Sequence, residues 1–97
     1  MPRYIYKIAP RRERFVETIT EAEQAIIGRH WQYLQEQFAL GKVQLVGRCV
    51  DAAFGITIFE ADSLDEAREL MEHDPVVAEN LFVADLHEFS VLLVRPS

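Results

Sequence analysis

KVQLVGRCVD (residues 42–51) and AFGITIFEA (residues 53–61) are two β-rich runs that follow each other almost directly, and they decide the fold. Both are rich in β-branched and aromatic residues, which favour strands. Residues 51–53 form a connection short enough for a hairpin, so we expect antiparallel neighbours. Glycine inside a strand often marks a bulge or a close approach of other groups, and each run contains one: Gly47 and Gly55.

A long helix is expected immediately before this hairpin. Thr20 is followed three residues later by Glu23, a capping box that satisfies backbone N–H groups at a helix start. Gly41 favours the left-handed geometry of a helix end, so the helix is predicted over residues 21–40. Gly28 inside it costs roughly 1 kcal/mol relative to alanine, which we interpret as a sign that another group comes close. Helical spacing predicts one apolar stripe facing the sheet: Ile27, Trp31, Leu34 and Phe38.

A second helix is expected after the hairpin. Ser63 and Glu66 repeat the capping pattern, and Pro75 ends the helix because a proline disfavours helical geometry in the residue before it. Asp74 lies at this break and, followed by proline, is a good N-cap for a short helix through PVVAENLF. The apolar residues of the second helix share one face: Leu64, Ala67, Leu70 and Met71.

The two ends of the chain supply the outer strands. YIYKIA (residues 4–9) is rich in β-branched and aromatic residues and stops at Pro10. LHEFSVLLV (residues 86–94) alternates as a half-buried strand does, with three apolar residues on one face: Phe89, Val91 and Leu93. Positive charge gathers in the loop after the first strand, where it is either solvated or holds an anion at the mouth of a site: Arg11, Arg12 and Arg14.

The expected order is therefore β-α-β-β-α-β. This is the split βαβ or ferredoxin-like arrangement, an α+β fold with a four-stranded antiparallel sheet and two helices on one face. No third long helix remains to cover the other face, which would be a large apolar patch. We expect a homodimer in which two such faces meet. The chain of 97 residues has no linker or repeat, so residues 1–97 are predicted to be a single domain.

Composition argues against several classes of protein. Sixteen acidic and ten basic residues give a net charge of −6, which would repel a phosphate backbone, so nucleic acid is not an expected partner. No apolar run approaches the ~20 residues that cross a bilayer, and the start lacks a signal peptide, so we expect no membrane partner and a cytoplasmic location. Cys49 is the single cysteine, no spacing matches a zinc site, and no nucleotide or hydrolase motif occurs. No metal or cofactor is predicted.

His30 is the leading candidate for chemistry. On a helix it shares a stripe with Ile26, Tyr33 and Gln37, beside the stripe that best fits the sheet, so it should lie at the edge of the core. An imidazole there is partly dried and still reachable, which suits a general acid or base near neutral pH. Taken alone, the residues favour the alternative, in which His30 is a satisfied structural histidine.

Asp74 is the second candidate for a catalytic role, with helix capping alone as the alternative. A capping carboxylate has one oxygen free, and if that oxygen faced His30 it would fix the tautomer of the ring and favour its charged form. Three neighbours of His30 are candidates for substrate binding. Tyr33 and Trp31 either line a pocket or belong to the core, and Arg29 or a loop arginine would hold a substrate carboxylate in a bidentate pair.

Over residues 4–94 the chain resembles the YciI-like (YCII-related) family of small proteins. The resemblance rests on two segments and three glycines: RHWQYL (residues 29–34), SLDEARELMEHDP (residues 63–75), Gly41, Gly47 and Gly55. It implies a ferredoxin-like fold assembled as a dimeric α+β barrel. It also implies a histidine and an aspartate that form an acid–base pair in a cleft, and the matching positions are His30 and Asp74. Related members act on chlorinated aromatic compounds, including chloromuconolactone-type substrates.

Two segments depart from the pattern of that family. The charged segment RRERFVETITEAEQ precedes the first helix, and PVVAENLF replaces a stretch richer in glycine and phenylalanine. Both would border the cleft, so the substrate does not carry over. The leading hypothesis is a cofactor-independent enzyme that uses the His30–Asp74 pair on a small carboxylic acid or lactone, as an isomerase, lyase or dehalogenase. The alternatives are a homodimer that binds a small molecule without turnover and a purely structural homodimer.

Overall fold

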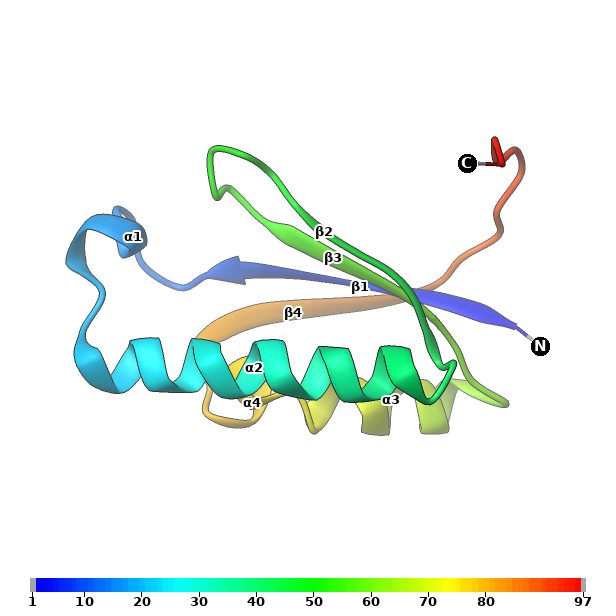
Figure 1. The fold of residues 1–97 in the computed structure, drawn as a ribbon, viewed down its shortest axis with the longest axis horizontal. Helices are drawn as coiled ribbons and strands as arrows, with labels where there is room; N and C mark the ends of the chain where they lie inside the picture. The colour runs from blue at the N-terminus through cyan, green and yellow to red at the C-terminus, as the bar shows by residue number, and fades with distance from the viewer. Residues whose placement is uncertain (1, 97) are drawn as a thin grey trace.

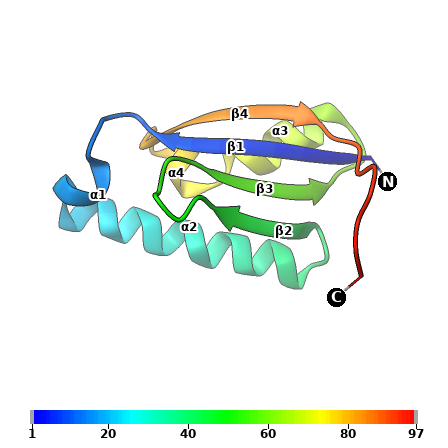
Figure 2. The ribbon, with the colours of Figure 1, turned by 90° about the horizontal axis from the view of Figure 1, so that it is seen from above.

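A four-stranded antiparallel sheet forms the centre of the fold. The computed structural model describes residues 2–96, and the strands lie in the order β2-β3-β1-β4. The first and last strands of the chain are therefore neighbours, and the hairpin of β2 and β3 forms one side of the sheet (Figure 2). The strands are β1 (Arg3–Pro10), β2 (Val43–Arg48), β3 (Gly55–Glu60) and β4 (Phe82–Glu88).

The longer helices lie on one face of this sheet, and the opposite face carries none (Figure 1). The order of elements confirms the predicted ferredoxin-like α+β fold, with two one-turn helices added to the two long ones. One short helix, α1, follows β1, and the other, α4, follows α3 (Figure 1). The helices are α1 (Phe15–Thr18), α2 (Glu21–Ala39), α3 (Leu64–Glu72) and α4 (Pro75–Ala78).

The helix boundaries follow the predicted capping residues. Thr20 Oγ1 accepts from the backbone N–H of Glu23 at 3.1 Å, and the Glu23 side chain accepts from the backbone N–H of Thr20 at 3.0 Å. Ser63 Oγ accepts from the backbone N–H of Glu66 at 3.1 Å. Gly41 follows α2 with a φ of 83°, a left-handed conformation that glycine adopts without strain.

The alternation of β1 builds the core between sheet and helices. Tyr4, Tyr6 and Ile8 are buried toward the helix layer, whereas the residues between them face the other side of the sheet. Tyr6 meets Phe59 of β3 edge to face, with ring centroids 5.7 Å apart. Such pairs stabilise a fold beyond the area they bury, by about 0.5–1.5 kcal/mol. The core places Tyr6 beneath the helices.

The inner stripe of α2 differs from the prediction. Leu34 is buried and Ile27 packs on the core, as expected. The rest of the stripe was predicted wrongly, because Trp31 is 54% and Phe38 60% exposed. Tyr33 and Ile26 pack on the core instead. The helix is therefore rotated toward the stripe that contains His30, which the hydrophobic pattern alone did not reveal.

The last strand was also predicted wrongly. It spans residues 82–88 rather than 86–94 and pairs with β1 from Pro10 opposite Phe82 to Tyr4 opposite Glu88. Beyond Glu88, strand β4 has passed the first residues of β1, its antiparallel partner. The last backbone hydrogen bond between the two segments runs from Phe89 N–H to Arg3 O, at 2.9 Å. Residues 89–96 have the stronger β-propensity, but no strand remains for them to pair with.

The hairpin at the sheet edge is shorter in its strands and longer in its loop than predicted. Its connection comprises residues 49–54, and the register shift lies between Val43 and Leu45 rather than at a glycine. A close approach does occur at Gly55, where a Cβ atom would lie 3.3 Å from the carbonyl oxygen of Gly47. At Gly28 residues 2–96 provide no such approach, because none of their atoms outside the backbone of the helix itself lies within 4 Å of the place its Cβ would take.

The helix-free face of the sheet combines apolar side chains with charged ones, among them Lys7 and Asp85. Its register places Ile5, Ile56 and Ile58 there, together with Leu45 and Val83, each 48% exposed. The terminal segment rises on the same side of the sheet (Figure 1). Within residues 2–96, no helix combines the length and apolar character needed to span a bilayer.

Candidate active site

Asp74 is a fully buried carboxylate surrounded by hydrogen-bond donors. It lies in the break between α3 and α4, where Asp74 Oδ1 accepts from the backbone N–H of Val76 at 3.2 Å. Its second oxygen, Oδ2, accepts from the hydroxyl of Tyr6 at 2.7 Å. The predicted capping role is thus present, and it leaves the carboxylate free for a further contact.

His30 supplies that contact from the middle of α2. Its Nδ1 lies 2.6 Å from Asp74 Oδ1, and its side chain is 14% exposed. A carboxylate that already accepts from Val76 and Tyr6 acts as an acceptor, so the proton between ring and carboxylate is assigned to Nδ1. The structure brings the two predicted side chains together.

The other ring nitrogen of His30 is left with a free lone pair. Within residues 2–96, Nε2 has no hydrogen-bond partner, and no buried side-chain nitrogen or oxygen of the described chain is unpaired. Nε2 must therefore retain access to solvent. An imidazole with Nδ1–H fixed by a carboxylate and Nε2 open is the arrangement of a general base.

Tyr6 is a site residue that the sequence did not reveal. Burial raises the pKa of its phenol well above the usual range, and the neighbouring charge of Asp74 raises it further. The phenol therefore stays protonated and remains a hydrogen-bond donor to the carboxylate. A buried tyrosine normally finds a partner for its hydroxyl, so the alternation of YIYKIA was a signal for a polar partner beneath the sheet, although not for which one.

A hollow of about 630 Å³ opens beside His30, between α1, α2 and the hairpin end of the sheet. This volume lies in the range of small-molecule sites, which are largely apolar with a few polar groups. Asp74 does not line the hollow and sits behind the histidine. Three polar residues line the hollow: His30, Arg48 and Thr57. Four aromatic residues also line it: Phe15, Trp31, Phe54 and Phe82.

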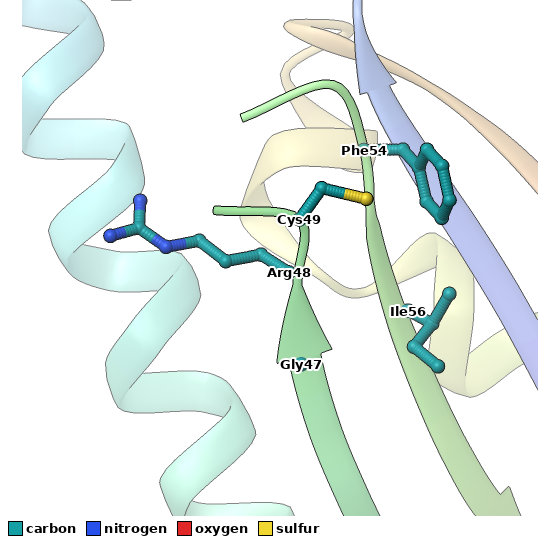
Figure 3. A pocket seen from close by; sticks show the side chains of 5 residues that line it. All are labelled: Gly47, Arg48, Cys49, Phe54 and Ile56. Carbon is teal, nitrogen blue, oxygen red and sulfur yellow. The ribbon is translucent and has the colours of Figure 1, made fainter. Parts of the chain in front are cut away.

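A smaller hollow of about 250 Å³ lies at the end of the hairpin. It is lined by Gly47, Arg48, Cys49, Phe54 and Ile56. Figure 3 shows Arg48 reaching from β2 toward α2, whereas the side chains of Cys49, Phe54 and Ile56 lie on the other side of β2. Arg48 thus extends toward the helix layer, into the region of the larger hollow that it also lines.

One of the three predicted substrate-binding residues lines the hollow, and the other two do not. Trp31 lines the large hollow, and Arg29 and Tyr33 do not. Arg29 is exposed, with Nη2 3.4 Å from a carboxylate oxygen of Glu79. Tyr33 donates to the carbonyl oxygen of Leu70 at 2.7 Å, and burial, with the charges of Asp74 and Glu69, raises its pKa to about 12.

The loop arginines are engaged within the chain rather than open to an anion. Arg12 forms an ion pair with Glu23 at 2.6 Å, and Arg14 forms one with Glu17 at 2.7 Å. Arg11 donates to the backbone and side chain of Asn80. They fix the path of the chain around α1. No cluster of three His, Cys, Asp or Glu side chains is placed to hold a metal ion in residues 2–96.

Fold and site together define a small α+β domain with a histidine–aspartate pair beside an apolar hollow. The chain belongs to the family described as the YCII-related domain, whose model matches residues 5–90.

One relative and one solved structure are informative comparisons. The chain is similar to the uncharacterized protein YjpA of Bacillus subtilis, with 36% identity over 52 residues. That match covers 54% of this chain and 61% of the relative, so it spans less than two thirds of YjpA. The fold resembles the 5-chloro-2-hydroxyhydroquinone dehydrochlorinase TftG from Burkholderia phenoliruptrix, solved with 2,5-dihydroxybenzoquinone, with a TM-score of 0.67. The identity is 21%, and the match covers 90% of this chain and 93% of that one. The likeness to TftG supports the α+β fold of this chain.

Proposed function

We propose that this protein is a cofactor-independent enzyme that moves a proton at a carbon of a small carboxylic acid or lactone. The observation that carries the proposal is the position of His30, which contacts a buried carboxylate through Nδ1 and lines an apolar hollow. A histidine with only a packing role would not need an open second nitrogen beside a space large enough for a ligand.

His30, Asp74 and Trp31 have different roles in the proposed reaction. His30 Nε2 takes a proton from a carbon next to a carbonyl group, and the resulting imidazolium returns it to the product or to water. Asp74 holds the ring in the tautomer that leaves Nε2 basic and stabilises the imidazolium. Trp31 forms part of the wall that orients the substrate. One placed acid or base contributes about 10²–10⁴-fold to a rate, so the walls must supply further acceleration through positioning.

The reaction class is that of an isomerase, lyase or dehalogenase. Loss of a proton next to a carbonyl leads to isomerisation when the proton returns elsewhere, and to elimination when a leaving group such as chloride departs with its electron pair. The dehydrochlorinase activity of TftG supports an elimination on this fold. The substrate of TftG does not carry over to this protein, since the two chains share 21% identity.

A proton-exchange assay tests the enzyme proposal. The wild type is incubated in deuterated water with a panel of small acids, lactones and their chlorinated forms, and NMR follows loss of the carbon-bound proton and release of chloride. His30→Gln should slow the reaction by about 10²-fold or more. The matched control is His73→Gln, because His73 is exposed at the end of α3 and does not line the hollow.

Two results separate this proposal from its alternative. Exchange or elimination that depends on His30 but not on His73 supports catalysis. Binding of panel compounds in the hollow without proton exchange or release of chloride rejects catalysis and favours a small-molecule-binding protein. Circular dichroism should show that every variant has the same fold as the wild type, so that both results can be interpreted.

We propose further that the protein acts as a homodimer joined through the helix-free face. The apolar residues of that face support this, as does the terminal segment, where Leu92, Leu93 and Val94 are 88%, 96% and 80% exposed. Such a patch is costly in water. Sedimentation analysis of the wild type and of Ile58→Glu tests it. A dimer that dissociates in the variant supports the proposal, and a wild-type monomer at micromolar concentration rejects it.

A further inference from the structure

Arg48 is a permanent cation with no partner in the part of the chain that the structure describes. The hydrogen bonds and ion pairs of residues 2–96 include Arg11, Arg12, Arg14 and Arg29, each bound to a neighbour, but not Arg48. Its side chain reaches toward α2 (Figure 3) and lines the hollow that His30 also lines. An unpaired guanidinium at an apolar cavity marks a position for an anion.

The charges around the hollow favour an anion over a neutral or cationic ligand. Its lining contains no aspartate or glutamate within residues 2–96, and Arg48 is its one permanently charged side chain. The chain as a whole carries a net charge of −6, so the hollow is a local exception to an acidic molecule. Apolar walls lower the effective dielectric and strengthen an ion pair formed against them.

The backbone beside Arg48 leaves room for such a ligand. Arg48 pairs with Gly55 across the hairpin, and both residues line the hollow. A Cβ on Gly55 would lie 3.7 Å from Arg48 Cβ and 3.6 Å from Ile8 Cγ1. A side chain at position 55 would therefore touch the stem of the arginine, which glycine leaves uncovered. The guanidinium fork can approach a planar carboxylate through two parallel hydrogen bonds.

We propose that Arg48 binds the carboxylate of the ligand and that the ligand is a small monoacid with an apolar body. This inference rests on the proposed function for the placement of the ligand in the hollow. It assigns the anion-binding role to β2 instead of Arg29 on α2. Trp31 contacts the apolar body, and His30 Nε2 reaches the part of the ligand away from Arg48.

Matched pairs of acid and amide test the inference without any need for turnover. NMR titrations measure the binding of salicylate and salicylamide, and of trans-cinnamate and cinnamamide, to wild type, Arg48→Gln and Arg48→Lys. The acids should bind the wild type, and Arg48→Gln should weaken them about tenfold to a hundredfold, the range for a hydrogen bond to a charged group. The amides should bind more weakly and be unaffected. Arg48→Lys should keep part of the affinity, because charge remains and the bidentate geometry is lost.

The control removes an equal charge from elsewhere on the surface. Arg68 on α3 is exposed and does not line the hollow, so Arg68→Gln changes the net charge identically without touching the site. It should leave acid binding unchanged. Thermal unfolding should be similar in Arg48→Gln and wild type, because no partner in residues 2–96 loses a bond.

The outcomes distinguish this inference from the enzyme proposal. Failure of every acid to bind, equal binding of acid and amide, or acid binding that survives Arg48→Gln overturns the role of Arg48. Exchange that depends on His30 would still support the enzyme in those cases. Acid binding that requires Arg48, without any exchange that depends on His30, supports the anion site and rejects catalysis.

Discussion

Tyr6 donates its phenolic hydrogen to Asp74 Oδ2 at 2.7 Å, joining residues 68 positions apart in the sequence. Both side chains are fully buried. The bond ties the central strand β1 to the start of α4 and completes the set of donors around the carboxylate. Its energy contributes to the fold, and its geometry fixes the orientation of the group that holds His30.

Tyr6→Phe should lower the free energy of unfolding by about 1–3 kcal/mol, because it leaves a buried carboxylate oxygen without its donor. Urea denaturation measures the loss. Tyr4→Phe is the matched control, since Tyr4 is buried on the same face of β1 and no bond of its hydroxyl is recorded within residues 2–96. Equal stability of Tyr6→Phe and wild type would contradict the importance of this bond.

Asp74→Asn should shift the ring proton of His30 from Nδ1 to Nε2 in a part of the molecules. An amide has one acceptor oxygen where the carboxylate has two, so its NH₂ group faces either Tyr6 or the place of Oδ1, which His30 and the backbone N–H of Val76 share. When it faces His30, the ring must present a lone pair at Nδ1. Nitrogen-15 NMR of the imidazole distinguishes the tautomers. A spectrum identical to that of the wild type would contradict the predicted shift of the proton.

Acid should weaken the fold through Glu23. Its pKa is lowered from the ordinary 4.5 to about 2, first by hydrogen bonds from Arg12 and then by the backbone N–H of Thr20. A lowered folded pKa gives stability that is present above pH 4.5 and lost as the pH falls toward 2. Glu23→Gln should therefore be less stable than wild type at neutral pH, and the difference should shrink across that window. Thermal unfolding at several pH values measures it, and a constant difference would refute the assignment.

Gly28→Ala should stabilise the protein by up to about 1 kcal/mol, because alanine lowers the entropy of the unfolded chain and favours a helix. The new Cβ meets no atom within 4 Å among residues 2–96. Gly55→Ala is the contrasting variant and should destabilise the fold, since its Cβ would lie 3.3 Å from the carbonyl oxygen of Gly47. Thermal unfolding of both variants should give shifts of opposite sign. A loss of stability in Gly28→Ala would indicate that α2 contacts another chain at this point.

Local signals predicted the order of elements and the helix starts correctly. Thr20 with Glu23 and Ser63 with Glu66 act through backbone bonds that need no tertiary contact, so the sequence alone locates them. The last strand was displaced because apolar residues 91–94 carry a stronger local pattern than residues 82–88. Its true position is set by the length of β1, a partner distant in sequence.

The candidate site was predictable only in part, for the same physical reason. The capping role of Asp74 is local, and the contact with His30 was an expectation drawn from a resemblance; the two side chains do meet, and their catalytic role stays a prediction. The bond of Tyr6 and the proposed role of Arg48 were missed because both depend on which way a strand faces and what lies across the sheet. Arg29 was named because the bidentate geometry of arginine suits a carboxylate, but it contacts Glu79 and does not line the hollow.

The carboxylate of Asp74 joins three parts of the chain that are made at different times. Tyr6 lies 68 positions before Asp74, His30 lies 44 positions before it, and Val76 lies two positions after it. During translation the early partners emerge long before the group that organises them. Any reactivity that depends on this cluster can therefore appear only after residues 74–76 have left the ribosome, and products truncated before these residues would lack it.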